Sequence, residues 1–144
     1  MNKKIKIAII GCGRIATKHF EAIKTHHENI ELVAVCDNNP AALEKATQET
    51  GVSGYSNLNT LLKNLELDLV TICTPSGIHA QQVIQCAKAG CHVMTEKPMA
   101  TRWKDGLAMV KACDDAGYIT YPSIERKKTF VISFFACEFI YKCN

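Results

Sequence analysis

The sequence predicts an α/β fold built on a doubly wound parallel sheet, with helices covering both faces of the sheet. Apolar runs of strand type alternate with helical patterns six times along the 144 residues, and the connections between them are short. One of these runs, Asp68–Cys73, is almost continuously apolar, which is typical of a strand that is buried on both faces. A chain of this length is sufficient for one domain with a core.

The first strand is expected at Lys4–Ile10, where the apolar run stops at two glycines, and the first helix from Arg14 to about His27. The second strand is expected at Ile30–Cys36. The later elements are, in order, a helix at Ala41–Thr50, an extended piece around Tyr55, a helix near Leu58–Asn64, a strand at Asp68–Cys73, a helix at Ile78–Ala89, a strand at Cys91–Met94, a helix from Thr101 to about Ala116 and a strand at Tyr118–Tyr121.

The ends of several helices are marked by residues that favour them. Pro40 suits the first position of a helix, because proline lacks the N–H that would be unpaired there. Gly51 and Gly117 follow helical patterns and are expected to end them. Thr101 is expected to be the N-cap of the last helix, because its hydroxyl can accept from a backbone N–H of the first turn.

The turn after the first strand, Gly11-Cys12-Gly13-Arg14-Ile15-Ala16, has the G-x-G-x-x-G/A form of a dinucleotide-binding turn. Gly11 allows a sharp bend, and Gly13 leaves the backbone bare for a pyrophosphate. Ala16 is small enough for the helix to lie close to the strand. The first N–H groups of that helix would then point at the phosphates, whose charge the helix dipole favours.

An acidic residue ends the second strand. Asp37 follows Ala16 by 21 residues, close to the spacing of about 20 found in this kind of nucleotide-binding unit. Its carboxylate can accept from the ribose hydroxyls of adenosine and would repel a 2′-phosphate, which favours NAD over NADP. The alternative is an ordinary β–α–β turn with a capping aspartate.

Four loops that follow strands are expected to meet at one crevice. Ligands of doubly wound sheets bind beyond the carboxyl ends of the strands. The second strand should pair with the first, which would bring Asp37 beside the glycine turn. The four loops are Gly11–Arg14, Asp37–Asn39, Thr74–His79 and Glu96–Pro98.

Composition argues against several classes of function. The net charge of +3 is spread along the chain without a sustained basic stripe, so nucleic-acid binding has no support. No apolar run reaches the 18–20 residues, roughly, that a membrane span requires. The eight cysteines include no C-x-x-C pair, and no secretory signal is present. We therefore expect reduced thiols in the cytoplasm, and neither disulfides nor a metal site.

Several stretches together resemble the glucose–fructose oxidoreductase / inositol dehydrogenase family. They are GCGRIA, VCDNNP, ICTPSGIH, AGCHVMTEKPMA and a helix that ends in DDAG, and the resemblance covers about residues 4–117. The most specific part is Glu96-Lys97-Pro98 after a strand. The longer stretch HVMTEKPMATRWKDGLAMVKACD is similar to one branch, the dehydrogenases that act at C3 of UDP-N-acetylglucosaminuronic acid in O-antigen and other surface-polysaccharide synthesis.

The resemblance implies a Rossmann-type NAD(P)-binding domain and a role for each matching residue. The pyrophosphate would be held by Gly11, Cys12, Gly13, Arg14 and Ile15. The ribose would be held by Asp37, with Asn38 beside it.

Toward the nicotinamide, the resemblance implies that Thr74 and Pro75 lie along the dinucleotide. It places His79 near the cofactor and the substrate, and Glu96 at the nicotinamide ribose. Lys97 matches the active-site lysine of the family.

Oxidation of a secondary alcohol needs a hydride acceptor and a group that handles the hydroxyl proton. The nicotinamide accepts the hydride. A lysine near it and away from bulk water could act as the base, or its positive charge could stabilise a developing alkoxide. Pro98 restricts the backbone beside Lys97, and a cis peptide bond is an option there.

Other polar residues have ordinary structural interpretations. His79, at the start of a helix, is as consistent with an ordinary helix residue as with a ligand contact. His19, His26 and His27 are expected at solvated helix positions. Arg102 and Trp103 are expected to cap or pack the last helix rather than bind substrate.

The chain departs from the family after Gly117. The predicted division is a Rossmann domain at residues 1–121 and a divergent tail at 122–144, without the C-terminal α+β domain that usually carries the substrate pocket and the interface of a homo-oligomer. The tail, with a basic patch followed by an aromatic apolar run, suggests off-frame translation to an early stop. The alternatives are an added strand or helix, or a segment that binds a partner. An amphipathic membrane tail is less favoured.

Two functions remain open at this point. The first is the cofactor half of an NAD-dependent dehydrogenase for a sugar substrate, with little or no turnover by these 144 residues alone. The alternative is a non-catalytic dinucleotide-binding module.

Overall fold

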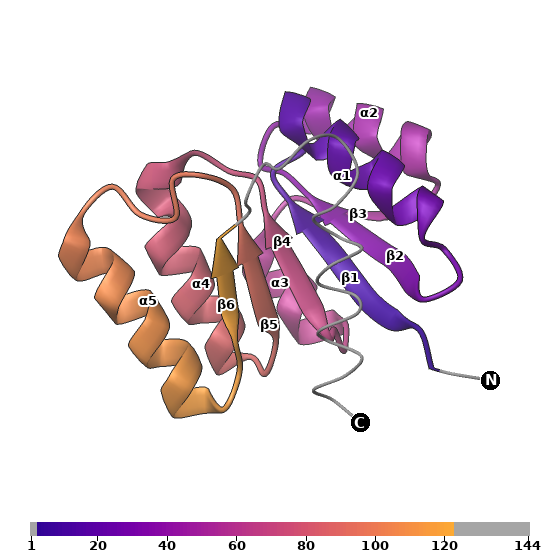
Figure 1. The fold of residues 1–144 in the computed structure, drawn as a ribbon. Coiled ribbons are helices and arrows are strands. Elements are labelled where there is room, and N and C mark those ends of the chain that lie inside the picture. Colours follow the sequence, from indigo (N-terminus) through magenta and orange to yellow (C-terminus); the bar gives the residue numbers. More distant parts are fainter. Residues whose placement is uncertain (1–2, 123–144) are drawn as a thin grey trace.

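The computed structural model describes residues 3–122, and their fold is the predicted one. Six parallel strands form one sheet in the order β3-β2-β1-β4-β5-β6 (Figure 1). The order reverses between β1 and β4, which is the topological switch point at which doubly wound sheets bind ligands. The strands are β1 Ile5–Ile10, β2 Ile30–Cys36, β3 Ser53–Tyr55, β4 Leu69–Ile72, β5 His92–Thr95 and β6 Thr120–Pro122.

Helices cover both faces of the sheet because successive residues of a strand point to opposite faces. The helices are α1 Arg14–Thr25, α2 Pro40–Thr50, α3 Leu58–Asn64, α4 His79–Lys88 and α5 Trp103–Ala116, with a short 3-10 turn η1 at Ser76–Ile78. On one face, side chains of β1 and β2 pack with α1 and α2, among them Ile7, Ile9, Val35, Phe20, Ile23 and Ala46. On the other, β1 and β4 pack with α3, α4 and α5, among them Ala8, Ile10, Val70, Leu61, Val83 and Met109.

Most predicted boundaries agree with the structure to within two residues. β2 and α3 have the predicted limits, and β1 begins one residue later than expected. Pro40 occupies the first turn of α2, and Gly51 ends that helix in the left-handed conformation. Gly117 does the same for α5. α4 begins at His79, because the chain first makes the 3-10 turn.

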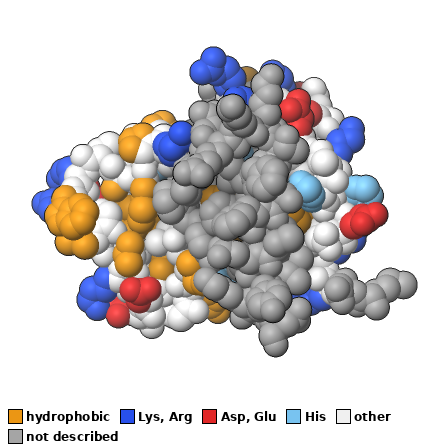
Figure 2. Space-filling model, in the orientation of Figure 1, with side chains coloured by type: hydrophobic (Ala, Val, Ile, Leu, Met, Phe, Trp, Pro, Cys, Tyr) orange, Lys and Arg blue, Asp and Glu red, His pale blue; other side chains and the backbone are white. Residues whose placement is uncertain are grey.

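The start of α5 differs from the prediction. The N-cap position is held by Arg102, not by Thr101. The Arg102 side chain is instead paired with the carboxylate of Asp105, with Nε 2.7 Å from Oδ2, across the first turn. Trp103 does not pack as expected, since 82% of it is exposed. Figure 2 shows hydrophobic side chains at the edge of the molecule where α5 lies.

The predicted tail, 122–144, lies outside the described residues except for Pro122 at the end of β6. The expectations about its origin therefore stay predictions. Within residues 3–122, no helix combines the length and the apolar character that crossing a membrane requires.

Candidate functional site

The turn after β1 is held tightly between the ends of two neighbouring strands. Gly11 has a φ of +90°, and its N–H donates to the carbonyl of Cys36 at 2.8 Å. A Cβ on Gly11 would lie 2.8 Å from the carbonyl carbon of Cys73 and from the nitrogen of Thr74. Only glycine fits here, because the neighbouring atoms belong to the backbone and cannot rotate away.

The second glycine of the turn has open space in front of it. No heavy atom of the described residues lies within 4 Å of the place that a Cβ on Gly13 would occupy. Gly13 is also the N-cap of α1 and makes no side-chain capping hydrogen bond to the first turn of the helix. Arg14 is exposed and Ile15 is half-buried, while Ala16 is fully buried against the sheet. A bare glycine and uncapped N–H groups fit a pyrophosphate.

Asp37 is joined directly to the glycine turn. Its Oδ2 accepts from the N–H of Cys12 at 2.7 Å, and its Oδ1 accepts from the N–H of Asn39 at 2.8 Å. The pairing of β2 with β1 is as predicted, and it brings Asp37 beside this turn. Asp37 is not the cap of α2, because the side chain of Asn39 holds that position. Each carboxylate oxygen retains acceptor capacity for a ribose hydroxyl, and Asn38 beside it is exposed.

The thiols around this turn resist ionisation. Burial, with the nearby carboxylate of Asp37 as a second cause, raises the pKa of Cys12 to about 12. The same two causes raise the pKa of Cys36 to about 11. Burial also raises the pKa of Cys73 well above its usual range. These groups are therefore neutral thiols at physiological pH.

We expect the Cys12 thiol of the folded chain to react with iodoacetamide far more slowly than the same thiol in the unfolded chain. With its pKa raised from 9.0 to about 12, the reactive thiolate at pH 8.5 is about a thousandfold rarer. The unfolded thiol loses its proton first as pH rises past 9, so the shift also lowers the free energy of unfolding at alkaline pH. Mass spectrometry of the Cys12 peptide measures the labelling, and equal rates with and without urea would contradict the prediction.

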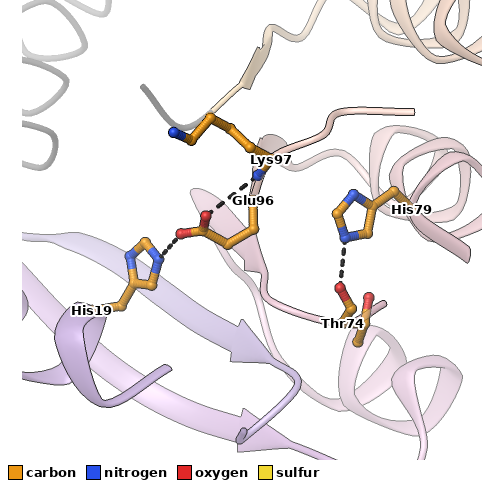
Figure 3. A network of polar contacts seen from close by, with 5 residues as sticks. All are labelled: His19, Thr74, His79, Glu96 and Lys97. Atoms are coloured by element: carbon orange, nitrogen blue, oxygen red, sulfur yellow. Dashed lines mark hydrogen bonds and ion pairs between the residues drawn. The ribbon is translucent and has the colours of Figure 1, made fainter. Parts of the chain in front are cut away.

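His79 links the loops that follow β4 and β5. Its ring is buried, with Nε2 2.7 Å from the carbonyl oxygen of Thr74 and Nδ1 3.2 Å from that of Pro98 (Figure 3). A neutral imidazole has one N–H and so donates to one of these carbonyls. The Thr74 hydroxyl donates to Gln82 of α4, and Pro75 is exposed. In this structure the ring of His79 touches backbone, and its contact with a cofactor stays a prediction.

The loop after β5 carries the Glu96-Lys97-Pro98 stretch. The peptide bond between Lys97 and Pro98 is cis, the option that the sequence had left open. The N–H of Lys97 donates to Oε2 of Glu96 at 3.3 Å. The Lys97 side chain is exposed and extends away from His79 and Thr74 (Figure 3).

His19 is the site residue that the sequence analysis missed. It is buried rather than solvated, and its Nε2 lies 2.6 Å from Oε1 of Glu96. A signal was present in the sequence, because Ala16, His19, Phe20 and Ile23 recur at the spacing of one helix face. All four are buried in α1.

The four predicted loops therefore meet at the carboxyl edge of the sheet. Direct contacts join the glycine turn to Asp37 and to the backbone after β4. His79 joins the loops after β4 and β5, and His19 joins α1 to Glu96. Among residues 3–122, no group of three or more His, Cys, Asp or Glu could hold a metal ion.

Comparisons with known proteins agree on one family. A sequence model described as an oxidoreductase family with an NAD-binding Rossmann fold matches residues 5–123. Among curated proteins, myo-inositol 2-dehydrogenase of Thermotoga maritima is 32% identical over 124 residues, which are 85% of this chain and 37% of that protein.

Two solved structures of WlbA dehydrogenases, both in complex with NADH and UDP-GlcNAcA, are also similar. The enzyme from Chromobacterium violaceum is 50% identical with a TM-score of 0.83, over 85% of this chain and 35% of that one. The enzyme from Bordetella pertussis is 48% identical with a TM-score of 0.82, over 83% of this chain and 37% of that one. The chain thus spans about a third of the length of these relatives.

Proposed function

Because the chain belongs to the oxidoreductase family with an NAD-binding Rossmann fold, we propose that it forms the cofactor half of a dehydrogenase that oxidises a secondary hydroxyl group. The hydrogen bond from the Cys12 N–H to Asp37 carries the proposal. It brings a carboxylate beside a bare turn, and this arrangement supports binding of the ribose and the pyrophosphate of one adenosine diphosphate.

The proposed substrate is a UDP-linked sugar acid, oxidised at C3 on the way to O-antigen or another surface polysaccharide. It is supported by the two WlbA dehydrogenases, which were solved with UDP-GlcNAcA and are 50% and 48% identical to this chain. The six cysteines of the described part are free, which fits a reducing compartment such as the cytoplasm.

In this proposal, each residue of the candidate site binds a different part of the dinucleotide. The N–H groups at Gly13 and the start of α1 bind the pyrophosphate, and Asp37 binds the adenosine ribose and disfavours a 2′-phosphate. Glu96 binds the ribose next to the nicotinamide. When bound, the nicotinamide supplies the hydride acceptor. Lys97 takes up the hydroxyl proton, or its positive charge stabilises the developing alkoxide.

A second candidate is a non-catalytic dinucleotide-binding module. The family model that matches residues 5–123 describes an NAD-binding Rossmann fold, which supports dinucleotide binding without reference to turnover. The two candidates share NAD binding and differ in turnover.

We expect the 144-residue chain to bind NADH in a calorimetric titration, and to bind NADPH more weakly because Asp37 repels the 2′-phosphate. With NAD and a UDP-linked sugar acid, we expect little or no NADH to form. Measurable turnover would establish a complete dehydrogenase and reject the module. A folded sample that binds neither dinucleotide would reject both candidates.

A further inference from the structure

One contact between a histidine ring and a carboxylate crosses the site from the first helix to the loop after β5. His19 lies in α1, the helix that begins at the glycine turn, and Glu96 immediately follows β5. Nε2 of His19 is 2.6 Å from Oε1 of Glu96, and only 9% and 16% of the two side chains are exposed. β4 lies between β1 and β5 in the sheet, so the pair joins segments that are not neighbouring strands.

The contact with His19 holds the Glu96 side chain in one conformation, although a glutamate side chain has several rotamers. A carboxylate that is largely removed from water needs hydrogen bonds to compensate for its lost hydration. Oε1 of Glu96 is held by the ring of His19, and Oε2 accepts from the N–H of Lys97 (Figure 3). Both oxygens are therefore oriented by groups of this chain.

The same loop is held on its other side by the second buried histidine. Nδ1 of His79 lies 3.2 Å from the carbonyl oxygen of Pro98. Residues 96–98 thus lie between two imidazole rings, one from α1 and one from α4. His19 contacts a side chain of this loop, that of Glu96, which is the one proposed for the nicotinamide ribose.

We infer that His19 is a positioning residue, which orients the Glu96 carboxylate toward the nicotinamide half of the dinucleotide. The inference rests on the proposed function, since it assigns Glu96 to that ribose. The inference goes beyond the proposed function because it names His19, which acts through Glu96. His19 lies in α1, the helix whose N-terminus is proposed to bind the pyrophosphate. His19 consequently matters for one half of the ligand although its helix begins at the other half.

A series of three ligands separates this role from a purely structural one. ADP contains only the adenosine half, ADP-ribose adds the second ribose, and NADH adds the nicotinamide. For His19→Ala we expect ADP binding within twofold of the unsubstituted chain, and ADP-ribose and NADH each weakened about tenfold, because a charge-assisted contact that positions the carboxylate is lost. His19→Gln, whose amide can donate to Glu96, should restore most of the affinity.

Two further variants keep the test decisive. Ile23→Val changes the same buried face of α1 without touching Glu96, and should leave all three affinities unchanged. Glu96→Ala removes the other partner outside the core and should give the same pattern as His19→Ala. In the double variant the losses should not add, because both changes remove one interaction.

The outcomes distinguish the inference from the proposed function. If His19→Ala weakens ADP as much as NADH, or weakens none of the three, the positioning role is wrong while NAD binding stands. If circular dichroism shows that His19→Ala does not fold, the test rests on His19→Gln and Glu96→Ala. Undiminished binding of ADP-ribose by Glu96→Ala would then overturn the inference. If the unsubstituted, folded chain does not bind NADH, the proposed function itself fails.

Discussion

Replacing Gly11 with alanine is expected to lower the free energy of unfolding by about 3 kcal/mol or more, and to abolish NADH binding. The φ of +90° disfavours any side chain at this position. The added Cβ would also lie under 3 Å from backbone atoms of Cys73 and Thr74. These atoms belong to the loop that follows β4, so the clash would push apart β1 and β4 at the switch point.

Two other glycines separate the causes of this loss. Gly51 has a φ of +72° with no heavy atom of the described residues within 4 Å of the added Cβ, so Gly51→Ala should cost only about 1 kcal/mol. Gly13 has a φ of −74° and the same open space, so Gly13→Ala should lower stability by no more than about 1 kcal/mol, because alanine is a poorer N-cap, and should weaken NADH binding. Urea denaturation and calorimetric titration measure both quantities. A Gly11→Ala chain as stable as Gly51→Ala would show that the close backbone approach is wrong.

Replacing Asp37 with alanine is expected to weaken NADH binding about a hundredfold, which corresponds to about 2.7 kcal/mol. The change removes the acceptor for the N–H groups of Cys12 and Asn39, both bound at under 3 Å. It leaves the half-buried Cys12 amide without its partner and removes the contact to the ribose. Because the repulsion of a 2′-phosphate is also lost, the preference for NADH over NADPH should shrink or reverse.

Asp68 provides a matched control. Its Oδ2 accepts from the N–H of Lys6 at 2.8 Å, but it precedes β4 and so lies at the opposite edge of the sheet. Asp68→Ala should lower stability by about 1 kcal/mol without changing either dinucleotide affinity. Titrations of both variants with NADH and NADPH make the comparison. An unchanged NADH affinity for Asp37→Ala would contradict the assignment of Asp37 to the ribose.

Much of the candidate site could be predicted from short stretches of sequence. The turn 11–16 and the strand that ends at Asp37 can each be recognised from a few residues. Parallel pairing of the first two strands then brings the turn and Asp37 together. The hydrogen bond between Cys12 and Asp37 is the result of that topology. The cap of α5 was less predictable, because Thr101 and Arg102 are adjacent and the packing of the helix decides which of them begins it.

Periodicity and glycine turns are local properties of the chain, and they were enough to predict the succession of strands and helices, the family and the edge of the sheet where the proposed ligand residues lie. The partners of the two buried histidines, by contrast, could be identified only in the folded chain. His19 and Glu96 are 77 residues apart, and His79 and Pro98 are 19 apart. Such contacts depend on how the helices pack against the sheet. The sequence pattern around one partner carries no information about the position of the other partner.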